Sequence, residues 1–238
     1  MSVDEIRSAF LGRFEGETRL EKFLAQRKER LAKAIGEEPW LMLSATPLFL
    51  REEIIDPRDE GVKHLLSSTP REDKVPFTVH CGWPSPILWG LRAEQNSGEG
   101  VQEYLEVHRI GHLEFGSAEA ISPAPTGSGN MLASGVVVGY TDSFVRLFAA
   151  LCEHAKVATP CAFGLTIRNA DGLLLATGKM FSTQARHWPE NVLDLPLTYV
   201  DDLSRESALV VKRINDRLWN AFGHDGCPFM DGTGQIRD

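Results

Sequence analysis

The N-terminal part of the chain places apolar residues at the spacing of an α-helix. In a first run these residues are Val3, Ile6, Phe10 and Phe14. Gly16 then interrupts the pattern, and a second run carries Leu20, Phe23, Leu24, Arg27, Leu31, Ala34 and Ile35. Because residues three and four apart share one face of a helix, the pattern predicts two amphipathic helices with a break at Gly16.

Shorter apolar runs, separated by turn residues, predict β-strands in the rest of the chain. The run "WLMLSATPLFL" after Pro39 is too short to span a membrane and is typical of a buried strand at the centre of a sheet. The segment "CAFGLTIRNADGLLLAT" alternates around the pair Asp171 and Gly172, as a β-hairpin does. Three further helices are expected: a short one that starts at Asp56 and runs through Leu66, one around Phe148 and one that ends at Gly223.

Together these elements predict an α+β fold. We expect a mixed, mainly antiparallel sheet with hairpins, packed by amphipathic helices on one side. Residues 117–135 contain "SPAPTGSGN" and have the composition of a mobile loop. The parts of the chain on either side of this loop each hold too few strands to close a sheet core, so we predict a single domain over residues 1–238.

Composition and charge narrow the class of protein. The 238 residues are 42% apolar and 24% charged, which is ordinary for a globular protein with a packed core. The net charge of −8 opposes nucleic-acid binding unless basic residues gather locally. The four cysteines form no C-x-x-C pair, which indicates reduced thiols, and the N-terminus "MSVDEIRSAF" lacks the pattern of a signal peptide. We therefore expect a cytoplasmic protein without a membrane segment.

Two histidines and two glutamates alternate in the stretch "EVHRIGHLEFG". A loop over residues 109–111, with its glycine in the left-handed conformation, pairs His108 with His112. The same register sets Glu106 opposite Glu114 on that face of the hairpin. Like charges across a sheet repel, so these four side chains favour a divalent metal. A bound metal would activate water while a carboxylate acts as the base, which is the chemistry of a hydrolase.

The alternative is that this hairpin face lies in water. Two exposed glutamates repel by roughly a few tenths of a kcal/mol at ordinary salt, so both can lie in solvent without a cation. A shift of the turn by one residue would place the two histidines on opposite faces. The sequence leaves the metal site and the solvated face open.

The second predicted helix carries a concentration of basic residues: Arg27, Lys28, Arg30 and Lys33. Such a cluster can contact an anion or the phosphates of a nucleic acid. Glu29 interrupts it and no aromatic residues are interleaved, which favours a charged helix face in water. Nucleic-acid binding through this chain alone is therefore not the main expectation.

Several segments have the same order and a similar pattern of hydrophobic residues as a known protein region. They are "FLAQRKERLAK", "WLMLSATPLFL", "YLEVHRIGHLEF", "YTDSFVRLFAALCEHAKVATPCAFGLTI" and "RLWNAFG". In this respect the chain resembles the C-terminal region of bacterial Schlafen-type regulators that contain an AlbA-like DNA-binding domain. DNA binding in that family is attributed to the AlbA-like domain, for which this sequence shows no counterpart. The resemblance implies an accessory domain linked to transcription regulation or defence, and it assigns no catalytic residue.

The leading expectation is a non-enzymatic accessory, sensing or oligomerisation domain that binds a protein partner or a second copy of itself. A metal-dependent hydrolase, using the histidines and glutamates of the hairpin, is one alternative. A weak nucleic-acid binder, acting through the basic helix, is another. We expect no cofactor under the leading hypothesis and a divalent metal under the first alternative.

Overall fold

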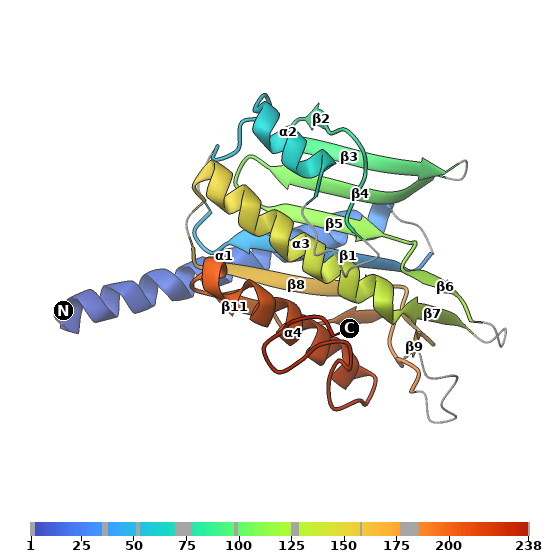
Figure 1. Cartoon of the computed structure of the whole chain (residues 1–238). Helices are drawn as coiled ribbons and strands as arrows, with labels where there is room; N and C mark the ends of the chain where they lie inside the picture. The colour runs from blue at the N-terminus through green and yellow to red at the C-terminus, as the bar shows by residue number, and fades with distance from the viewer. Residues whose placement is uncertain are drawn as a thin grey trace.

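The computed structural model of the chain describes most of its residues. These are residues 3–34, 38–50, 53–69, 78–97, 100–124, 129–157, 159–176 and 186–237, with the side chains of residues 12–30 in the first helix. The described residues form an α+β fold, as the sequence predicts (Figure 1). Helices cover both faces of a mainly antiparallel sheet.

The fold is built around one large sheet. Its strands lie in the order β10-β8-β1-β5-β4-β3-β2, and β11 also pairs with β8. All of these pairings are antiparallel. The strands are β1 (Trp40–Pro47), β2 (Ser85–Ile87), β3 (Gly90–Ser97), β4 (Gly100–His108), β5 (Leu113–Ser117), β8 (Cys161–Arg168), β10 (Val192–Asp194) and β11 (Thr198–Val200).

Strand β1 lies at the centre of this sheet, as its apolar run predicts. It pairs with β5 on one side and with β8 on the other, and all of its residues are buried. Side chains alternate between the two faces of a strand, so β1 contributes to the layers on both sides of the sheet. Leu41, Leu43 and Ala45 face the main hydrophobic core. Met42 and Thr46 face the opposite side.

Three helices cover the face of the sheet that holds the main core. They are α2 (Glu60–Ser67), α3 (Ser134–Ala155) and α4 (Leu203–Ala221). α3 lies between the other two and crosses the middle of the sheet (Figure 1). By length and composition α3 is apolar enough to span a membrane, but most of it is buried within the fold, where it serves as the core helix.

The remaining helix, α1 (Val3–Ala34), crosses the opposite face of the sheet (Figure 1). The expectation of helices on one side only is corrected by this placement. α1 is also continuous where the sequence predicts a break. A Cβ atom at Gly16 would lie 3.2 Å from the carbonyl oxygen of Leu48, so this glycine lets the helix backbone approach the end of β1. Gly16 is therefore a packing contact inside one helix.

The structure has a second sheet of three strands where the sequence predicts a loop and a hairpin. Its strands are β6 (Ile121–Pro123), β7 (Asn130–Ala133) and β9 (Leu174–Ala176), in the order β6-β7-β9. The first two lie within residues 117–135, which the sequence predicts as a loop. β9 pairs in parallel with β7 and not with β8, so the hairpin predicted around Asp171 and Gly172 is wrong. Left-handed residues at Asn169 and Gly172 redirect the chain after β8.

Candidate functional site

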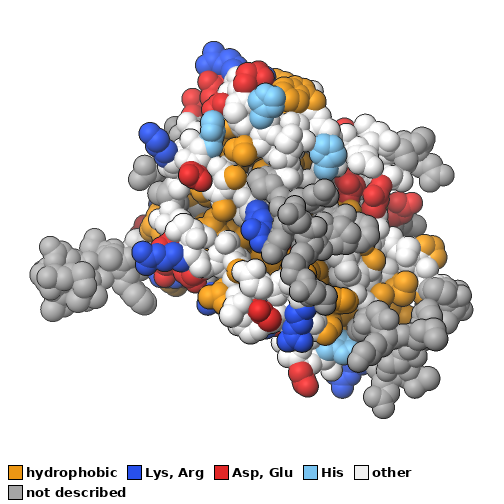
Figure 2. All heavy atoms as spheres, viewed as in Figure 1, with side chains coloured by type: hydrophobic (Ala, Val, Ile, Leu, Met, Phe, Trp, Pro, Cys, Tyr) orange, Lys and Arg blue, Asp and Glu red, His pale blue; other side chains and the backbone are white. Residues whose placement is uncertain are grey.

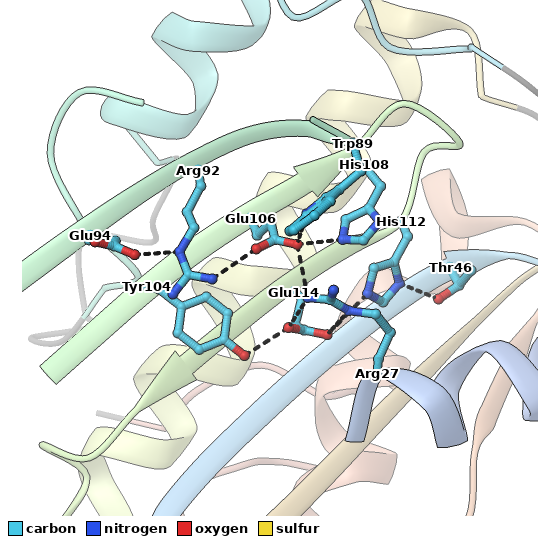
Figure 3. Close-up of polar contacts among 10 residues, drawn as sticks. All are labelled: Arg27, Thr46, Trp89, Arg92, Glu94, Tyr104, Glu106, His108, His112 and Glu114. Atoms are coloured by element: carbon cyan, nitrogen blue, oxygen red, sulfur yellow. Dashed lines mark hydrogen bonds and ion pairs between the residues drawn. The ribbon is translucent and has the colours of Figure 1, made fainter. Parts of the chain in front are cut away.

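The hairpin of "EVHRIGHLEFG" is present in the predicted register. Strands β4 and β5 set Glu106 opposite Glu114. The loop closes with the amide of His108 donating to the carbonyl of His112 at 2.8 Å, and Gly111 takes the left-handed conformation with φ +84°. One face of the hairpin therefore carries the two histidines and the two glutamates together (Figure 3).

This face is not exposed to water. Glu106 and His112 are fully buried, Glu114 is 1% exposed and His108 is 6% exposed. Helix α1 covers them: the ring of Phe23 packs edge-on against both imidazoles, with centroid distances of 5.9 Å to His108 and 4.9 Å to His112. The interpretation of this face as a solvated one is therefore wrong.

The cation between the two glutamates is a side chain of the protein itself. Arg27 extends from α1 and lies between Glu106 and Glu114 (Figure 3). Its Nη2 donates to Oε1 of each carboxylate at 2.8 Å, and its Nε donates to Oε2 of Glu114 at 3.1 Å. An arginine 79 and 87 residues away in sequence thus offsets the repulsion that the hairpin register creates.

Other side chains complete the hydrogen bonding of Glu106. It accepts from Trp89 Nε1 at 2.6 Å, from His108 Nε2 at 2.6 Å and from Arg92 Nη1 at 3.0 Å. With the bond from Arg27, the carboxylate accepts four hydrogen bonds. Three of these bonds are to Oε1 and the bond from Arg92 is to Oε2, so both oxygens of Glu106 are engaged by donors of the protein.

Both oxygens of Glu114 also accept hydrogen bonds from side chains of the protein. Besides its two bonds from Arg27, it accepts from the Tyr104 hydroxyl at 2.8 Å and from His112 Nε2 at 3.3 Å. Both oxygens of each carboxylate accept from side chains of the protein, and the guanidinium of Arg27 lies between the two carboxylates. Among the residues that the structure describes, no group of three or more His, Cys, Asp or Glu side chains is arranged to hold a metal. The four predicted metal ligands are brought together, but around an arginine.

His112 is held as a neutral imidazole. Burial lowers its pKa, and the hydrogen bond with Glu114 opposes that effect only in part. Its Nδ1 lies 2.7 Å from the Thr46 hydroxyl, while its Nε2 faces Glu114. A neutral ring with its proton on Nε2 satisfies both contacts, because Thr46 then donates to Nδ1 and Nε2 donates to the carboxylate.

The two glutamates are held ionised. Burial by itself would raise the pKa of Glu114, but the hydrogen bonds from His112 and Arg27 outweigh it and keep that pKa well below its usual range. Burial also acts to raise the pKa of Glu106, and the bond from His108 together with the charge of Arg27 lowers it by more. Two arginines balance these two carboxylates, which is the condition under which charges can be buried.

Two other residues of the predicted basic cluster also have partners within the protein. Lys28 donates to both carboxylate oxygens of Asp194 at 2.6 Å, and the guanidinium of Arg30 lies 3.8 Å from the ring centroid of Trp89. The side chain of Lys33 lies outside the described residues. On the face shown in Figure 2, the described Lys and Arg side chains lie among Asp and Glu rather than in a separate patch. Of the predicted basic cluster, Arg27 therefore joins the four predicted metal ligands in one buried polar cluster, while Lys28 makes its contact outside it and Arg30 lies over the ring of Trp89.

Four residues of this cluster were not predicted from the sequence: Trp89, Arg92, Tyr104 and Thr46. Tyr104 stands two residues before Glu106, so the alternation along β4 is a signal that identifies it. Trp89 and Arg92 reach the cluster through the pairing of β3 with β4, and Thr46 reaches it through β1. These pairings are long-range, and the local pattern does not reveal them.

A second buried carboxyl lies on the opposite face of β4. Glu103 is 4% exposed and accepts hydrogen bonds from the Ser117 hydroxyl at 2.7 Å and the Tyr140 hydroxyl at 2.6 Å. Both of these donors are neutral. Burial raises the pKa of Glu103, and the two hydroxyl groups oppose this only in part.

Replacing Glu103 with glutamine is expected to stabilise the protein near pH 8 by on the order of 1 kcal/mol. A raised pKa means that the folded protein holds this proton more tightly than the unfolded chain, so stability falls as the pH rises through the folded pKa. The advantage of Glu103→Gln should shrink towards pH 4, where the wild-type carboxyl is protonated. Urea unfolding at both pH values measures it, with the exposed Glu153→Gln as the control. An equal effect of the two substitutions at pH 8 would contradict the assignment.

Comparison of the chain with protein-family models, with curated proteins and with solved structures returns no match. The resemblance to Schlafen-type regulators therefore stays a hypothesis from the sequence. The function has to be argued from the arrangement of the described residues.

Proposed function

We propose that this chain is a non-enzymatic protein-association domain in which α1 carries the contact. The buried polar cluster supports a role in holding this helix rather than in chemistry. All four oxygens of its two carboxylates accept hydrogen bonds from side chains of the protein, and the two histidines and two glutamates of the hairpin face are buried. The cluster is accordingly an anchor between α1 and the sheet.

The observation that carries the proposal is that the N-terminal part of α1 extends away from the rest of the protein. Its 32 residues make a helix about 48 Å long. The described contacts of α1 with the rest of the molecule run from Arg13, whose Nη1 lies 3.6 Å from Oδ1 of Asp201, to Arg30, whereas the helix backbone before them extends away (Figure 1). Isolated helices shorter than about 12–15 residues are marginal in water, so an extension of this kind gains stability from a partner.

The exposed side chain at the start of the described part of α1 agrees with this role. Phe14 is 63% exposed, although a phenylalanine gains about 1.5–3 kcal/mol on full burial. A partner that covers this ring would recover that free energy. We therefore place the contact on the projecting part of α1, with Phe14 at its base.

The cysteines favour a non-enzymatic role as well. Burial raises the pKa of Cys152 and of Cys161 to about 12 and that of Cys227 to about 11, and it raises the pKa of Cys81 further. The thiolate is the reactive form of cysteine, so these thiols are poor nucleophiles at neutral pH. All four are free in the structure.

The biological setting of the proposal comes from the sequence resemblance alone. If the likeness to Schlafen-type regulators holds, the association domain serves a bacterial transcription-regulation or defence system in the cytoplasm. Its contribution there would be to bring protein chains together, with DNA contacts made by other parts of the assembly. The net charge of −8 supports this division of roles.

The proposal is tested by placing a photo-crosslinking amino acid at position 14. Irradiation of the purified protein, and of cells that produce it, is expected to join position 14 to one defined protein, because this position faces the partner. The same amino acid at Gln26, which is also exposed on α1, is the matched control and should give little product. Product from Gln26 alone, or from neither position, would contradict association through this part of α1.

A further inference from the structure

We infer that the buried polar cluster is an acid-sensitive anchor, which releases α1 from the sheet at mildly acidic pH while the rest of the fold stays intact. As a means of regulating the association helix, this release rests on the proposed function. The release itself is a property of a single chain. It follows from how α1 is docked and from the groups that surround His112.

Helix α1 packs against the sheet through contacts of its own. Its Leu20 and Leu24 form a small apolar cluster with Leu48 and Ala162. Among the described residues, none from α1 belongs to the main hydrophobic core on the other face of the sheet. An element with few buried contacts to the core can open at a lower free energy than the whole protein needs to unfold. The docking of α1 can therefore be lost while the main core stays packed.

His112 lies beneath α1 and resists protonation while the helix is docked. The side chain is fully buried, and the ring of Phe23 covers it at a centroid distance of 4.9 Å. Its Nδ1 contacts the Thr46 hydroxyl and its Nε2 faces Glu114 (Figure 3). Release of α1 removes Phe23 and Arg27 and admits water, so the pKa of His112 returns towards the ordinary value of about 6.5. The released form therefore binds a proton that the docked form does not.

The charges that surround His112 oppose a further positive charge in the docked form. The polar groups that face it are Arg27 from α1, Thr46 from β1, Tyr104, Glu106 and His108 from β4, Glu114 from β5 and, through Glu106, Arg92 from β3 (Figure 3). In this set two arginines already balance two glutamates. Burial is the largest cause of the lowered pKa of His112; Glu114 acts against it, and the charges of His108 and Arg27 act with it. The ring of His108 is 5.0 Å away between centroids.

The two glutamates respond to acid in the same direction. Although burial acts to raise their pKa values, hydrogen bonds from the neighbouring histidines, together with Arg27, lower them by more. Release withdraws Arg27 from between Glu106 and Glu114, so the released form binds protons at a higher pH than the docked form. Acid therefore favours release at His112 and at both carboxylates.

The other face of the sheet responds to acid in the opposite direction. Glu103 lies there, where it accepts from the Tyr140 hydroxyl of α3, and burial raises its pKa. The folded body therefore holds the proton of Glu103 more tightly than the unfolded chain does, so acid favours the body. Because one face loses stability in mild acid and the other gains it, the expected response is release of α1 rather than unfolding of the whole protein.

Residue-resolved amide exchange of dilute protein at pH 7 and pH 5 tests this inference, with each rate divided by the intrinsic rate at that pH. Protection of residues 20–30 in α1 should fall about tenfold, because a form that binds one more proton gains about tenfold per pH unit below the histidine pKa. Residues 161–168 of β8 should keep their protection, since they belong to the sheet that stays folded.

Two variants assign the response to His112. In His112→Gln the fall in residues 20–30 should disappear, because glutamine can donate to Glu114 and accept from Thr46 but takes up no proton. His154→Gln is the matched control and should behave as the wild type does. This histidine is 38% exposed and pairs with Asp59, away from the cluster.

The outcomes separate this inference from the proposed function. Equal loss of protection in residues 20–30 and 161–168 would mean that acid unfolds the whole protein, and no loss in either would mean that the anchor ignores acid; each overturns the inference without any variant. A fall that persists in folded His112→Gln overturns the role of His112. Acid release without a crosslink from position 14 contradicts the proposed function alone, whereas the crosslink without acid release contradicts the anchor alone.

Discussion

Replacing Arg27 with methionine is expected to lower the free energy of unfolding by about 3–5 kcal/mol. The substitution keeps an apolar side chain of similar length but leaves Glu106 and Glu114, both almost fully buried, without the cation between them. Removing only the cation of a buried ion pair lowers the free energy of unfolding by more than the intact pair contributes to it. The reason is that the remaining carboxylates stay desolvated. Urea unfolding at pH 7.5 measures the loss.

The neighbouring lysine provides the matched control for that substitution. Lys28 pairs with Asp194, whose side chain is 47% exposed, so Lys28→Met should cost at most about 1 kcal/mol. Arg27→Lys should fall between the two, because it keeps the charge but cannot donate to both carboxylates in the same planar arrangement. Equal losses for Arg27→Met and Lys28→Met would mean that the cluster does not anchor α1.

His112 and the two glutamates of the cluster are expected to lower the stability in two stages as the pH falls from neutral, while Glu103, whose pKa is raised, contributes in the opposite direction. The first stage comes from His112, whose pKa burial lowers: below about pH 6.5 the unfolded chain takes up a proton that the folded protein does not. The second stage comes from Glu106 and Glu114, whose pKa values are lowered on folding. Their contribution is complete above the ordinary glutamate pKa and is lost as the pH falls further.

A single variant separates the two stages. In His112→Gln the ring that resists protonation is gone, so the fall between pH 7 and 5 should become smaller while the fall below about pH 4.5 remains. Urea unfolding midpoints, measured from pH 8 to pH 3 on both proteins, give the comparison. An unchanged first stage in His112→Gln would show that other groups cause it.

The hairpin is the part of the site that local sequence determines. Its register depends on a short loop with glycine in a left-handed position, and both lie within the stretch that contains His108 and His112. The alternation of apolar and polar residues then fixes which side chains share a face. This is why the pairing of Glu106 with Glu114 could be predicted from a few residues.

The burial of that face could not be predicted in the same way. A polar hairpin face is usually solvated, and its two glutamates carry no sign that an arginine from another part of the chain will lie between them. Arg27 itself falls both in the periodic run of the second predicted helix and in the basic cluster, and the sequence does not decide between these two positions. Only the path of α1 across the sheet brings these residues together, and that path is decided by tertiary packing at Leu20 and Leu24.

Two errors in the predicted elements have a similar origin. Gly16 looks like a helix stop because glycine destabilises helices by about 1 kcal/mol, but here it allows close contact between α1 and Leu48. The Asp171-Gly172 pair looks like a hairpin turn, yet the edge of β8 is taken by β10 and β11, which leaves β9 to pair with β7. In both cases long-range packing overrides a local preference.

The most direct test of the account is residue-resolved amide exchange along α1 at increasing protein concentration. The account predicts that residues 20–30 are protected at every concentration, because the buried cluster holds them on the sheet. Residues 4–14 should exchange faster than residues 20–30 wherever no partner covers them, because this part of α1 extends away from the sheet. If residues 20–30 exchange as fast as residues 4–14 at every concentration, α1 is not anchored to the sheet and the account is contradicted.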